Sequence, residues 1–223
     1  ASVVDHVMEN EAAIGTKAIV LVCYSGQSAA WAGSLLKLAG YSNAKSLKFG
    51  MSSWTDAAGY DSWSGNVGNT YKDMLETTAN SVGPMNDLPE INTGFETGEE
   101  ILMARIKAVE TAGFSALATT GQATWDNKDT WYVMNYWGTD HYNSGHIPGA
   151  IQFDSGATVS PYTLASNLKT IPVDGTTAVV YCYTGQTSSW VSTYLNVLGY
   201  TNVKTLKFGA NGMFEETMPG TRW

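Results

Sequence analysis

Arginine is nearly missing from this 223-residue chain, and cysteine and histidine are scarce. The chain has two arginines, two cysteines and three histidines, and its formal net charge is −8. Nucleic-acid binding requires a cationic face, and a sequence with 12 Lys plus Arg and no basic cluster does not offer one. The cysteines and histidines do not show metal-ligand spacing, so we expect no metal site. No organic cofactor is expected either.

Long apolar runs are also missing. No stretch reaches the roughly 18 apolar residues that a membrane-spanning helix needs, so no span is expected. The first residues lack the basic start and apolar centre of a signal peptide. The hydrophobic content of 43%, with 8 Trp and 12 Tyr, is nevertheless enough for real cores. The length allows one large domain or two of about 100 residues each.

What the sequence does contain is an internal repeat, and each cysteine lies in one copy of it. The segment CYSGQSAAWAGSLLKLAGYSNAKSLKFG runs from Cys23 to Gly50, and CYTGQTSSWVSTYLNVLGYTNVKTLKFG runs from Cys182 to Gly209. Fourteen of these 28 aligned positions are identical. Chance does not produce such a match, so the chain holds two copies of one structural unit.

Each copy predicts a strand, a helix and a second strand. A short β-branched run (17–22 or 177–181) precedes the cysteine, and the helical stretch after it ends at Gly40 or Gly199. Residues 44–49 or 203–208 form the second strand. So short a unit implies a right-handed parallel crossover. Each cysteine therefore lies at the carboxyl end of a strand, where open α/β sheets place their chemistry.

The region between the two copies divides into two parts. Residues 55–94 are rich in Gly, Asn, Ser and Thr, and we expect a linker there. A capping-box pattern at Thr97 and Glu100 then predicts a helix whose apolar face carries Leu102, Ile106 and Val109. A strand candidate, TWYVMNY, and the stretch HYNSGHIPGAIQFD follow it.

The two copies differ in what precedes them. Ala1 aligns with Ser160, so the first copy has no counterpart of residues 97–159. We therefore expect a partial domain at 1–54, a linker at 55–94 and a complete domain at 95–223. Our hypothesis is that the chain is a truncated or nicked form of a longer protein, with a companion N-terminal fragment as a partner.

The turn after each cysteine is suited to stabilise a sulfur anion. A thiol attacks as its thiolate, and the turn precedes a helix whose free N–H groups and positive dipole end point toward the sulfur. Gly26 and Gly185 let the backbone curl into an anion-binding nest. Hydroxyl donors come from Ser28, Thr187 and Ser188. No general base is present, so the turn suits sulfur-to-sulfur transfer better than peptide hydrolysis.

Two separated motifs mark the second half. They are GHIPGAIQF, from Gly145 to Phe153, and the C-x-x-G-x-[ST] loop at Cys182. With these motifs, residues 97–223 resemble the rhodanese family of sulfurtransferases, and residues 1–54 resemble a partial copy. The resemblance implies an α/β fold of two rhodanese-like domains, each a parallel sheet flanked by helices, with the first domain N-terminally incomplete. It also implies a persulfide on Cys182, held by the N–H groups from Tyr183 to Ser188.

The expected site comprises both thiols and the loops that follow them. Cys182 and Cys23 are the expected catalytic residues. The expected substrate-binding residues are Tyr183, Thr184, Gly185, Gln186, Thr187, Ser188 and Lys207, and in the first copy Tyr24, Ser25, Gly26, Gln27 and Ser28. Many family members place Arg or Lys in the loop, whereas both loops here are neutral. We therefore expect Lys207, in the LKFG strand end, to supply the missing positive charge.

Other interpretations of these residues are less favoured. A disulfide would require matching strand ends of two domains to lie within roughly 7 Å. A cysteine phosphatase needs arginine at the sixth position after the cysteine, where this chain has Ser188 or Ala29. His146 is a tempting general base, but in the family pattern it belongs to a structural turn. The mercaptopyruvate branch holds its carboxylate with arginines, which this chain nearly lacks.

We therefore expect a sulfurtransferase that moves sulfane sulfur from thiosulfate, polysulfide or a persulfide through a cysteine persulfide. The expected partners are a small anionic sulfur compound and a thiol, sulfite or cyanide acceptor. The alternative is a catalytically silent rhodanese module that acts in sulfide or persulfide binding or in protein interaction. The low Lys and Arg content and the likeness to secreted tandem members point to an extracytoplasmic location, periplasmic or secreted.

Overall fold

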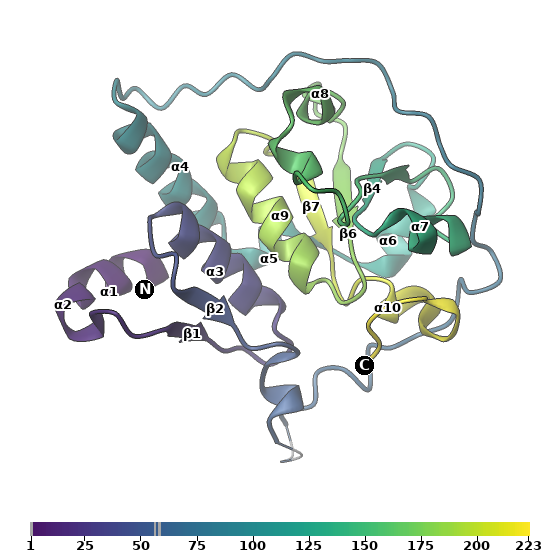
Figure 1. Ribbon diagram of the computed structural model, residues 1–223, viewed down its shortest axis with the longest axis horizontal. Helices are drawn as coiled ribbons and strands as arrows, with labels where there is room; N and C mark the ends of the chain where they lie inside the picture. The colour runs from purple at the N-terminus through teal and green to yellow at the C-terminus, as the bar shows by residue number, and fades with distance from the viewer. Residues whose placement is uncertain (1, 56, 58) are drawn as a thin grey trace.

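The computed structural model describes residues 2–55, 57 and 59–223, and it contains two parallel sheets (Figure 1). The larger sheet consists, in spatial order, of β3 (Ala118–Thr119), β7 (Val203–Leu206), β6 (Ala178–Tyr181), β4 (Tyr132–Asn135) and β5 (Ile151–Gln152). The smaller sheet consists of β1 (Ile19–Leu21) and β2 (Ala44–Ser46). The predicted α/β class with parallel sheets flanked by helices is confirmed.

Helices connect these strands in the predicted order. In the first half they are α1 (Val3–Glu9), α2 (Glu11–Ile14), α3 (Gln27–Leu38) and the 3-10 helix η1 (Gly50–Ser53). Next come α4 (Gly98–Ala112), α5 (Phe114–Leu117), α6 (Gly121–Asp126) and α7 (Thr139–Ser144). The last are η2 (Pro161–Thr163), α8 (Ala165–Leu168), α9 (Gln186–Val197), α10 (Asn211–Phe214) and η3 (Glu215–Thr217). Each copy of the repeat is thus a strand, a helix and a strand, as β1–α3–β2 and β6–α9–β7.

The larger sheet is buried on both faces. Val133 and Val179 belong to the apolar cluster on one face, while their neighbours Met134 and Val180 belong to the cluster on the other. This alternation is the pattern of a parallel sheet covered by helices on both sides. Cys182 follows the central strand of this sheet directly, so a rigid and well-packed element positions it.

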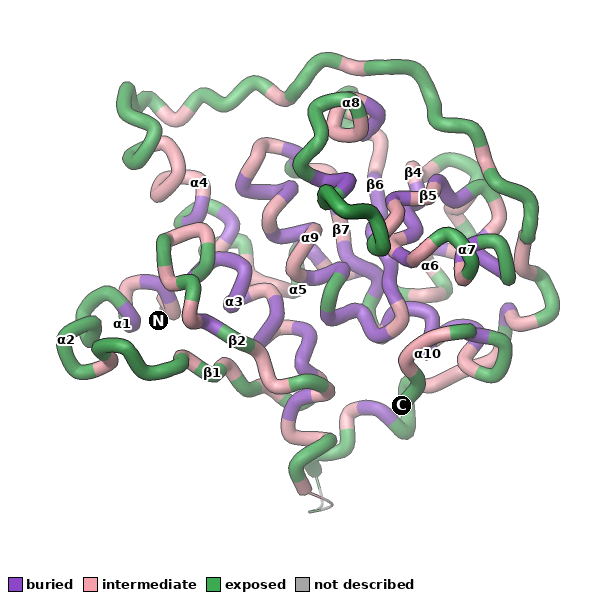
Figure 2. The backbone as a smooth tube through the Cα atoms, in the orientation of Figure 1, coloured by how far each residue is buried: buried purple, intermediate pink, exposed green. Residues whose placement is uncertain are grey.

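The two halves meet along α3 and α9, which lie side by side in Figure 1. Gly33 leaves room for the Trp190 ring, because a Cβ on this glycine would lie 2.6 Å from Trp190 Cη2. Ser34 Oγ also donates a hydrogen bond of 3.0 Å to the carbonyl of Trp190. Both helices carry buried residues along their length (purple in Figure 2).

The helix α4 packs across this contact. Thr97 caps it by accepting a hydrogen bond from the N–H of Glu100, as the capping-box pattern predicts. Its buried residues Ile106 and Val109 share one apolar cluster with Leu35, Leu36 and Val197 of α3 and α9. The predicted apolar face of α4 therefore joins the two halves.

The segment expected to be a linker wraps around the larger half before it enters α4 (Figure 1). Its described residues form no helix, and one isolated bridge pairs Glu76 with His146. Trp63 of this segment is nonetheless fully buried. Among the helices of the described residues, none has the length and apolar character needed to cross a bilayer.

Candidate active site

The thiol of Cys182 lies beneath the first turn of α9. Gly185 precedes this helix with a φ of 73°, a left-handed conformation that glycine adopts without strain. The N–H of Ser188 consequently points at the sulfur, at 3.3 Å from Cys182 Sγ. The hydroxyl of Ser188 lies 3.7 Å from the same sulfur and 2.8 Å from Thr205 Oγ1. The Cys182 side chain is buried.

The thiol of Cys23 has the same setting at the start of α3. Gly26 has a φ of 83°, and its N–H lies 3.1 Å from Cys23 Sγ. The N–H of Ala29 lies 3.4 Å from this sulfur, but Ala29 offers no hydroxyl. Cys23 is partly exposed, and both thiols are free. The N–H of Ser188 is thus the main-chain donor at Cys182, whereas Cys23 has those of Gly26 and Ala29, so the expected set from Tyr183 to Ser188 is seen in one member.

The end of each LKFG motif packs onto the cysteine loop of its own half. Phe49 and Phe208 have left-handed backbones, with φ values of 61° and 60°. Residues other than glycine rarely adopt this backbone conformation, and those that do are often found at functional sites. A Cβ on the following glycine would lie 2.2 Å from the Cys23 carbonyl at Gly50, or 2.3 Å from the Cys182 carbonyl at Gly209.

The loop glutamines reach across to the opposite half. Gln27 Oε1 accepts a hydrogen bond of 2.7 Å from the N–H of Phe208. Gln186 Oε1 accepts one of 2.8 Å from the N–H of Phe49. Both were expected to bind substrate. The structure instead engages both side-chain carbonyls in this reciprocal exchange, although Gln186 also lines the cavity described below.

Trp63 lies between the two LKFG ends. Its ring packs edge-on against the rings of Phe49 and Phe208. The centroid distances are 5.2 Å and 5.1 Å, and both interplanar angles are 85°. Its Nε1 donates a hydrogen bond of 3.2 Å to the carbonyl of Ser25, in the Cys23 loop. Trp223 stacks on it with a centroid distance of 5.5 Å. Trp63, in the segment between the halves, thus packs against the LKFG ends and the Cys23 loop and supports the site.

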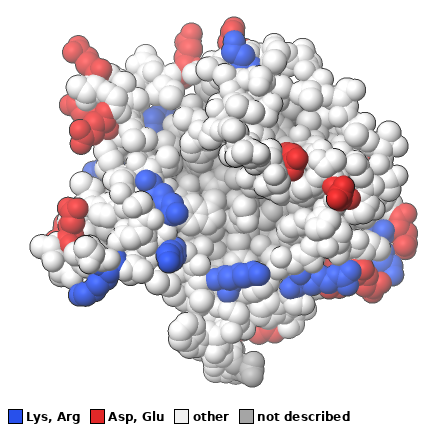
Figure 3. Space-filling model, in the orientation of Figure 1, with Lys and Arg blue, Asp and Glu red and all other residues white. Residues whose placement is uncertain are grey.

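A cavity of about 310 Å³ opens at Cys182. Its lining residues are Ser46 and Lys48 of the first half, Cys182, Tyr183, Thr184, Gln186, Thr187 and Trp190, and Thr221 near the carboxyl end. No carboxylate is among these lining residues. On the face shown in Figure 3, several basic side chains gather along the lower part.

The cation that lines this cavity is Lys48, whereas the sequence led us to expect Lys207, whose role stays a prediction. Lys207 is not among the lining residues, and its Nζ lies 5.9 Å from the centroid of the Phe208 ring. The reason is the way the halves dock, because the strand end of the first half reaches the cavity of the second. Trp190 and Thr221 also line the cavity, and neither of them was among the expected site residues.

The ring of Tyr183 forms one wall of the Cys182 cavity. It stacks on Trp137 with a centroid distance of 4.8 Å and an interplanar angle of 9°. The backbone at Gly220 packs against this ring, since a Cβ there would lie 2.1 Å from Tyr183 Cε1. The Tyr183 hydroxyl is hydrogen-bonded to His141 Nδ1. Burial, with a smaller contribution from Cys182, raises the pKa of Tyr183 to about 12, so its hydroxyl stays protonated.

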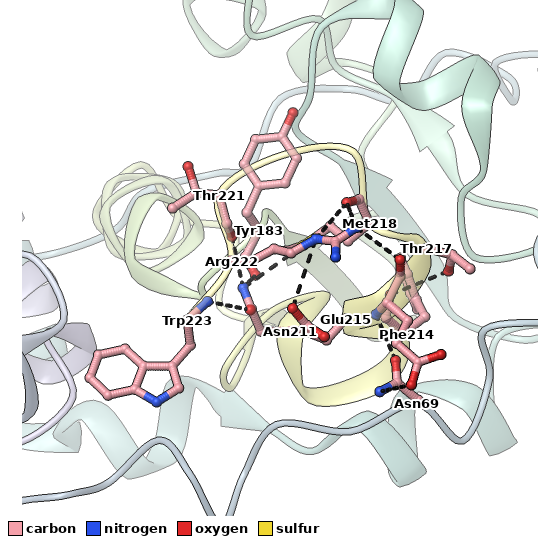
Figure 4. Close-up of polar contacts among 11 residues, drawn as sticks. Asn69, Tyr183, Asn211, Phe214, Glu215, Thr217, Met218, Thr221, Arg222 and Trp223 are labelled. Carbon is pink, nitrogen blue, oxygen red and sulfur yellow. Dashed lines mark hydrogen bonds and ion pairs between the residues drawn. The ribbon is translucent and has the colours of Figure 1, made fainter.

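Residues 218–223 are held against the site by Asn211 (Figure 4). The side-chain amide of Asn211 donates to the carbonyl of Thr221 at 2.9 Å and accepts from the N–H of Trp223 at 2.9 Å. Arg222 is not among the residues that line the cavity, and it donates to the carbonyls of Glu216 and Met218. This guanidinium therefore serves the local fold.

The cavity at Cys23 is smaller and differently lined. It measures about 230 Å³, and its lining residues are Val22, Cys23, Tyr24, Met51 and Tyr60. Of the residues expected to bind substrate in this loop, Tyr24 lines the cavity, whereas Ser25, Gly26, Gln27 and Ser28 do not. No lysine or arginine is among its lining residues.

His146 belongs to a packed turn. It is fully buried, its ring stacks on Tyr142 at 3.7 Å, and its Nδ1 lies 2.7 Å from the carbonyl of Tyr142. Burial lowers the pKa of His146, although Glu76 lies nearby. These contacts agree with the structural interpretation of this histidine. Within the described residues, no group of three or more His, Cys, Asp or Glu is placed to hold a metal ion.

A comparison with protein families relates this site to a known fold. A family model described as a rhodanese-like domain matches residues 4–57 and 135–216. The match includes both cysteine loops and both LKFG ends, so it agrees with a tandem arrangement. A comparison with curated proteins finds no matching sequence.

Proposed function

Because the chain belongs to the rhodanese-like family, we propose that it transfers sulfane sulfur through a persulfide on Cys182. The observation that supports this proposal best is the Cys182 site itself. The sulfur lies at the end of a buried strand, faces the N–H and hydroxyl of Ser188, and borders a cavity of about 310 Å³. Family membership supports a sulfurtransferase or a sulfur-binding module, and the substrates are part of the proposal.

The first proposed step loads the cysteine. The Cys182 thiolate attacks the outer sulfur of an anionic donor such as thiosulfate. The sulfur–sulfur bond of the donor breaks, sulfite leaves with the bonding electron pair, and a persulfide forms on Cys182. With polysulfide, the leaving group is a polysulfide shorter by one sulfur. The hydrogen bond from the N–H of Ser188 favours the anionic sulfur at the start of this step, because bonds to ionised groups are the stronger ones. The Ser188 hydroxyl accepts from the thiol, and it can donate to the sulfur once the thiol is ionised.

The second proposed step removes the outer sulfur from the Cys182 persulfide. A thiophilic acceptor, namely a thiolate, sulfite or cyanide, attacks the outer sulfur of the persulfide. The bond between the two sulfurs breaks, and Cys182 leaves as the thiolate that the loop accommodates. No general base is required, because both nucleophiles react as anions. The proposed cycle therefore depends more on groups that stabilise an anion than on proton transfer.

Lys48 has the proposed role of attracting the anionic donor. It lines the Cys182 cavity, and no carboxylate is among the lining residues to oppose it. Since the chain carries a formal net charge of −8, a local positive charge at the cavity matters for the approach of an anion. Lys48 is exposed, so its contribution to binding should be modest.

The experiment that tests this proposal is mass spectrometry after exposure to thiosulfate or polysulfide. The wild type, Cys23→Ser and Cys182→Ser are compared, and one added sulfur appears as a gain of about 32 Da. We expect Cys23→Ser to gain this mass on Cys182, and cyanide to remove it. A folded wild type that gains no sulfur on either thiol would refute the proposal and favour a silent binding module.

A further inference from the structure

The two halves of the chain differ in how their central strands are paired. In the second half, β6 lies between β7 and β4, with Val179 paired to Lys204 and to Val133. In the first half, the equivalent strand β1 pairs with β2 in the same register, with Val20 opposite Lys45. Among the described residues, no strand lies along the other edge of β1. Figure 1 shows that edge at the margin of the molecule.

The backbone of β1 presents polar groups to this edge. The N–H of Ile19 and the carbonyl of Leu21 are bonded toward β2, to the carbonyl of Asn43 and the N–H of Leu47. In a parallel strand the intervening residues bond to the opposite side, so the groups of Val20 and Val22 face outward. The residue equivalent to Val22 in the second half is Tyr181. Its carbonyl accepts a 2.9 Å hydrogen bond from the N–H of Tyr136, which directly follows β4.

The side chains on this edge are apolar and exposed. Val20 is 57% exposed and Val22 is 49% exposed, whereas their equivalents Val179 and Tyr181 are fully buried. An exposed strand with an apolar surface is a template for pairing with another chain. In the part of the chain that the structure describes, the first half therefore carries the apolar residues of a central strand without a strand that covers them.

The same contrast extends beyond the strand. Tyr24 is exposed, whereas its equivalent Tyr183 stacks on Trp137. Trp54 is 72% exposed, whereas its equivalent Met213 is fully buried. Val22 and Tyr24 line the same surface cavity, and exposed apolar side chains that lie together mark interaction sites in soluble proteins.

One block of the second half covers all of these equivalent positions. Trp137 contacts the rings of Tyr181 and Tyr183, and the N–H of Ile147 donates to the Tyr181 hydroxyl at 3.1 Å. A Cβ on Gly121 would lie 2.9 Å from the side chain of Met213. Residues 118–153, which contain β3, α6, β4, α7 and β5, therefore form in the second half the interface that the first half leaves open.

We propose that the free edge of β1 takes up a parallel strand from a different polypeptide, one that carries a block similar to residues 118–153. The arriving strand would bond to the backbone of Val20 and Val22, and an aromatic residue after it would cover Tyr24. Within the described residues, the chain ahead of β1 is already engaged, because Glu110 of α4 accepts hydrogen bonds from Ser2, Val3 and Val4. Strand addition of this kind takes its affinity from main-chain hydrogen bonds and its specificity from side-chain contacts.

The test uses the full chain and a synthetic peptide of residues 130–138, with lysines added at its carboxyl end for solubility. This segment contains β4, which fills the equivalent edge in the second half. We expect the peptide to slow hydrogen–deuterium exchange at the amides of Val20 and Val22 and to leave that of β6 unchanged. The control peptide carries Met134→Pro, which removes an N–H on the pairing side of the strand.

Two variants of the full chain sharpen this test. Val20→Lys should weaken peptide binding about tenfold or more, because it brings a charge into an apolar contact. Val82→Lys, at a valine that is 56% exposed elsewhere, should leave binding unchanged. Equal protection by both peptides, or no protection by either, would overturn the proposal. Self-association of the full chain that Val20→Lys abolishes would also overturn it, because the occupant would then be a second copy. None of these readouts depends on sulfur transfer.

Discussion

Replacing Trp63 by alanine removes the aromatic ring on which both LKFG ends rest. The ring is fully buried and touches Phe49 and Phe208 edge-on, and its Nε1 bonds to the carbonyl of Ser25. Truncating a buried tryptophan costs about 3–5 kcal/mol. Losing the hydrogen bond to Ser25 adds about 1 kcal/mol. We therefore expect Trp63→Ala to lower the free energy of unfolding by about 5 kcal/mol, out of the roughly 5–15 kcal/mol typical of a protein.

The assay is urea unfolding followed by far-ultraviolet circular dichroism, because the variant changes the tryptophan fluorescence. Trp54→Ala is the matched control, since this tryptophan is 72% exposed and its loss should change stability by less than about 0.5 kcal/mol. A Trp63→Ala variant within about 1 kcal/mol of the wild type would refute the reasoning. Residues 55–94 would then cover the surface without contributing to the stability of the hydrophobic core.

Three further outcomes are expected. Ser188→Ala should slow sulfur uptake at Cys182 about fivefold, the worth of one net hydrogen bond, and an unchanged rate in stopped-flow measurements would contradict this. Lys48→Gln should raise the KM for thiosulfate about two- to fivefold while Lys207→Gln leaves it unchanged, and the reverse result would restore the role of Lys207. Burial lowers the pKa of His146, so its contribution to stability is present above the unfolded value near 6.5 and is lost as the pH falls from there through the lower folded pKa. His146→Gln should flatten the fall of the urea midpoint between about pH 7 and 5, and parallel profiles would argue against this.

The repeat made much of the fold predictable. Because both copies carry the same pattern of a β-branched run, a turn and a helical stretch, β1–α3–β2 and β6–α9–β7 lie where the sequence predicts them. The helix expected after Thr97 is observed as α4. The N–H groups aimed at both sulfurs could also be predicted, since a strand that turns directly into a helix leaves its first N–H groups unpaired. The proposed domain boundaries stay predictions.

The contacts between the halves could not be predicted in this way. Lys48 and Lys207 stand in the same motif, so local sequence gives no reason to prefer one of them at Cys182. The side-chain carbonyls of Gln27 and Gln186 accept hydrogen bonds from the opposite half. Trp63 is buried although its segment has the composition of a linker. Each of these depends on how two distant surfaces dock, and turn or helix propensity carries no information about docking.

The crossed glutamines have a consequence for how such a protein can change over time. Gln27 and Gln186 each satisfy an N–H that belongs to the other half, at Phe208 and Phe49. A buried donor left unsatisfied costs about 1–3 kcal/mol. A recombination event that imports one half from a relative without a matching acceptor would therefore start with a weakened molecule. Selection is thus expected to retain the two halves as a co-adapted pair, even though each descends from the same ancestral unit.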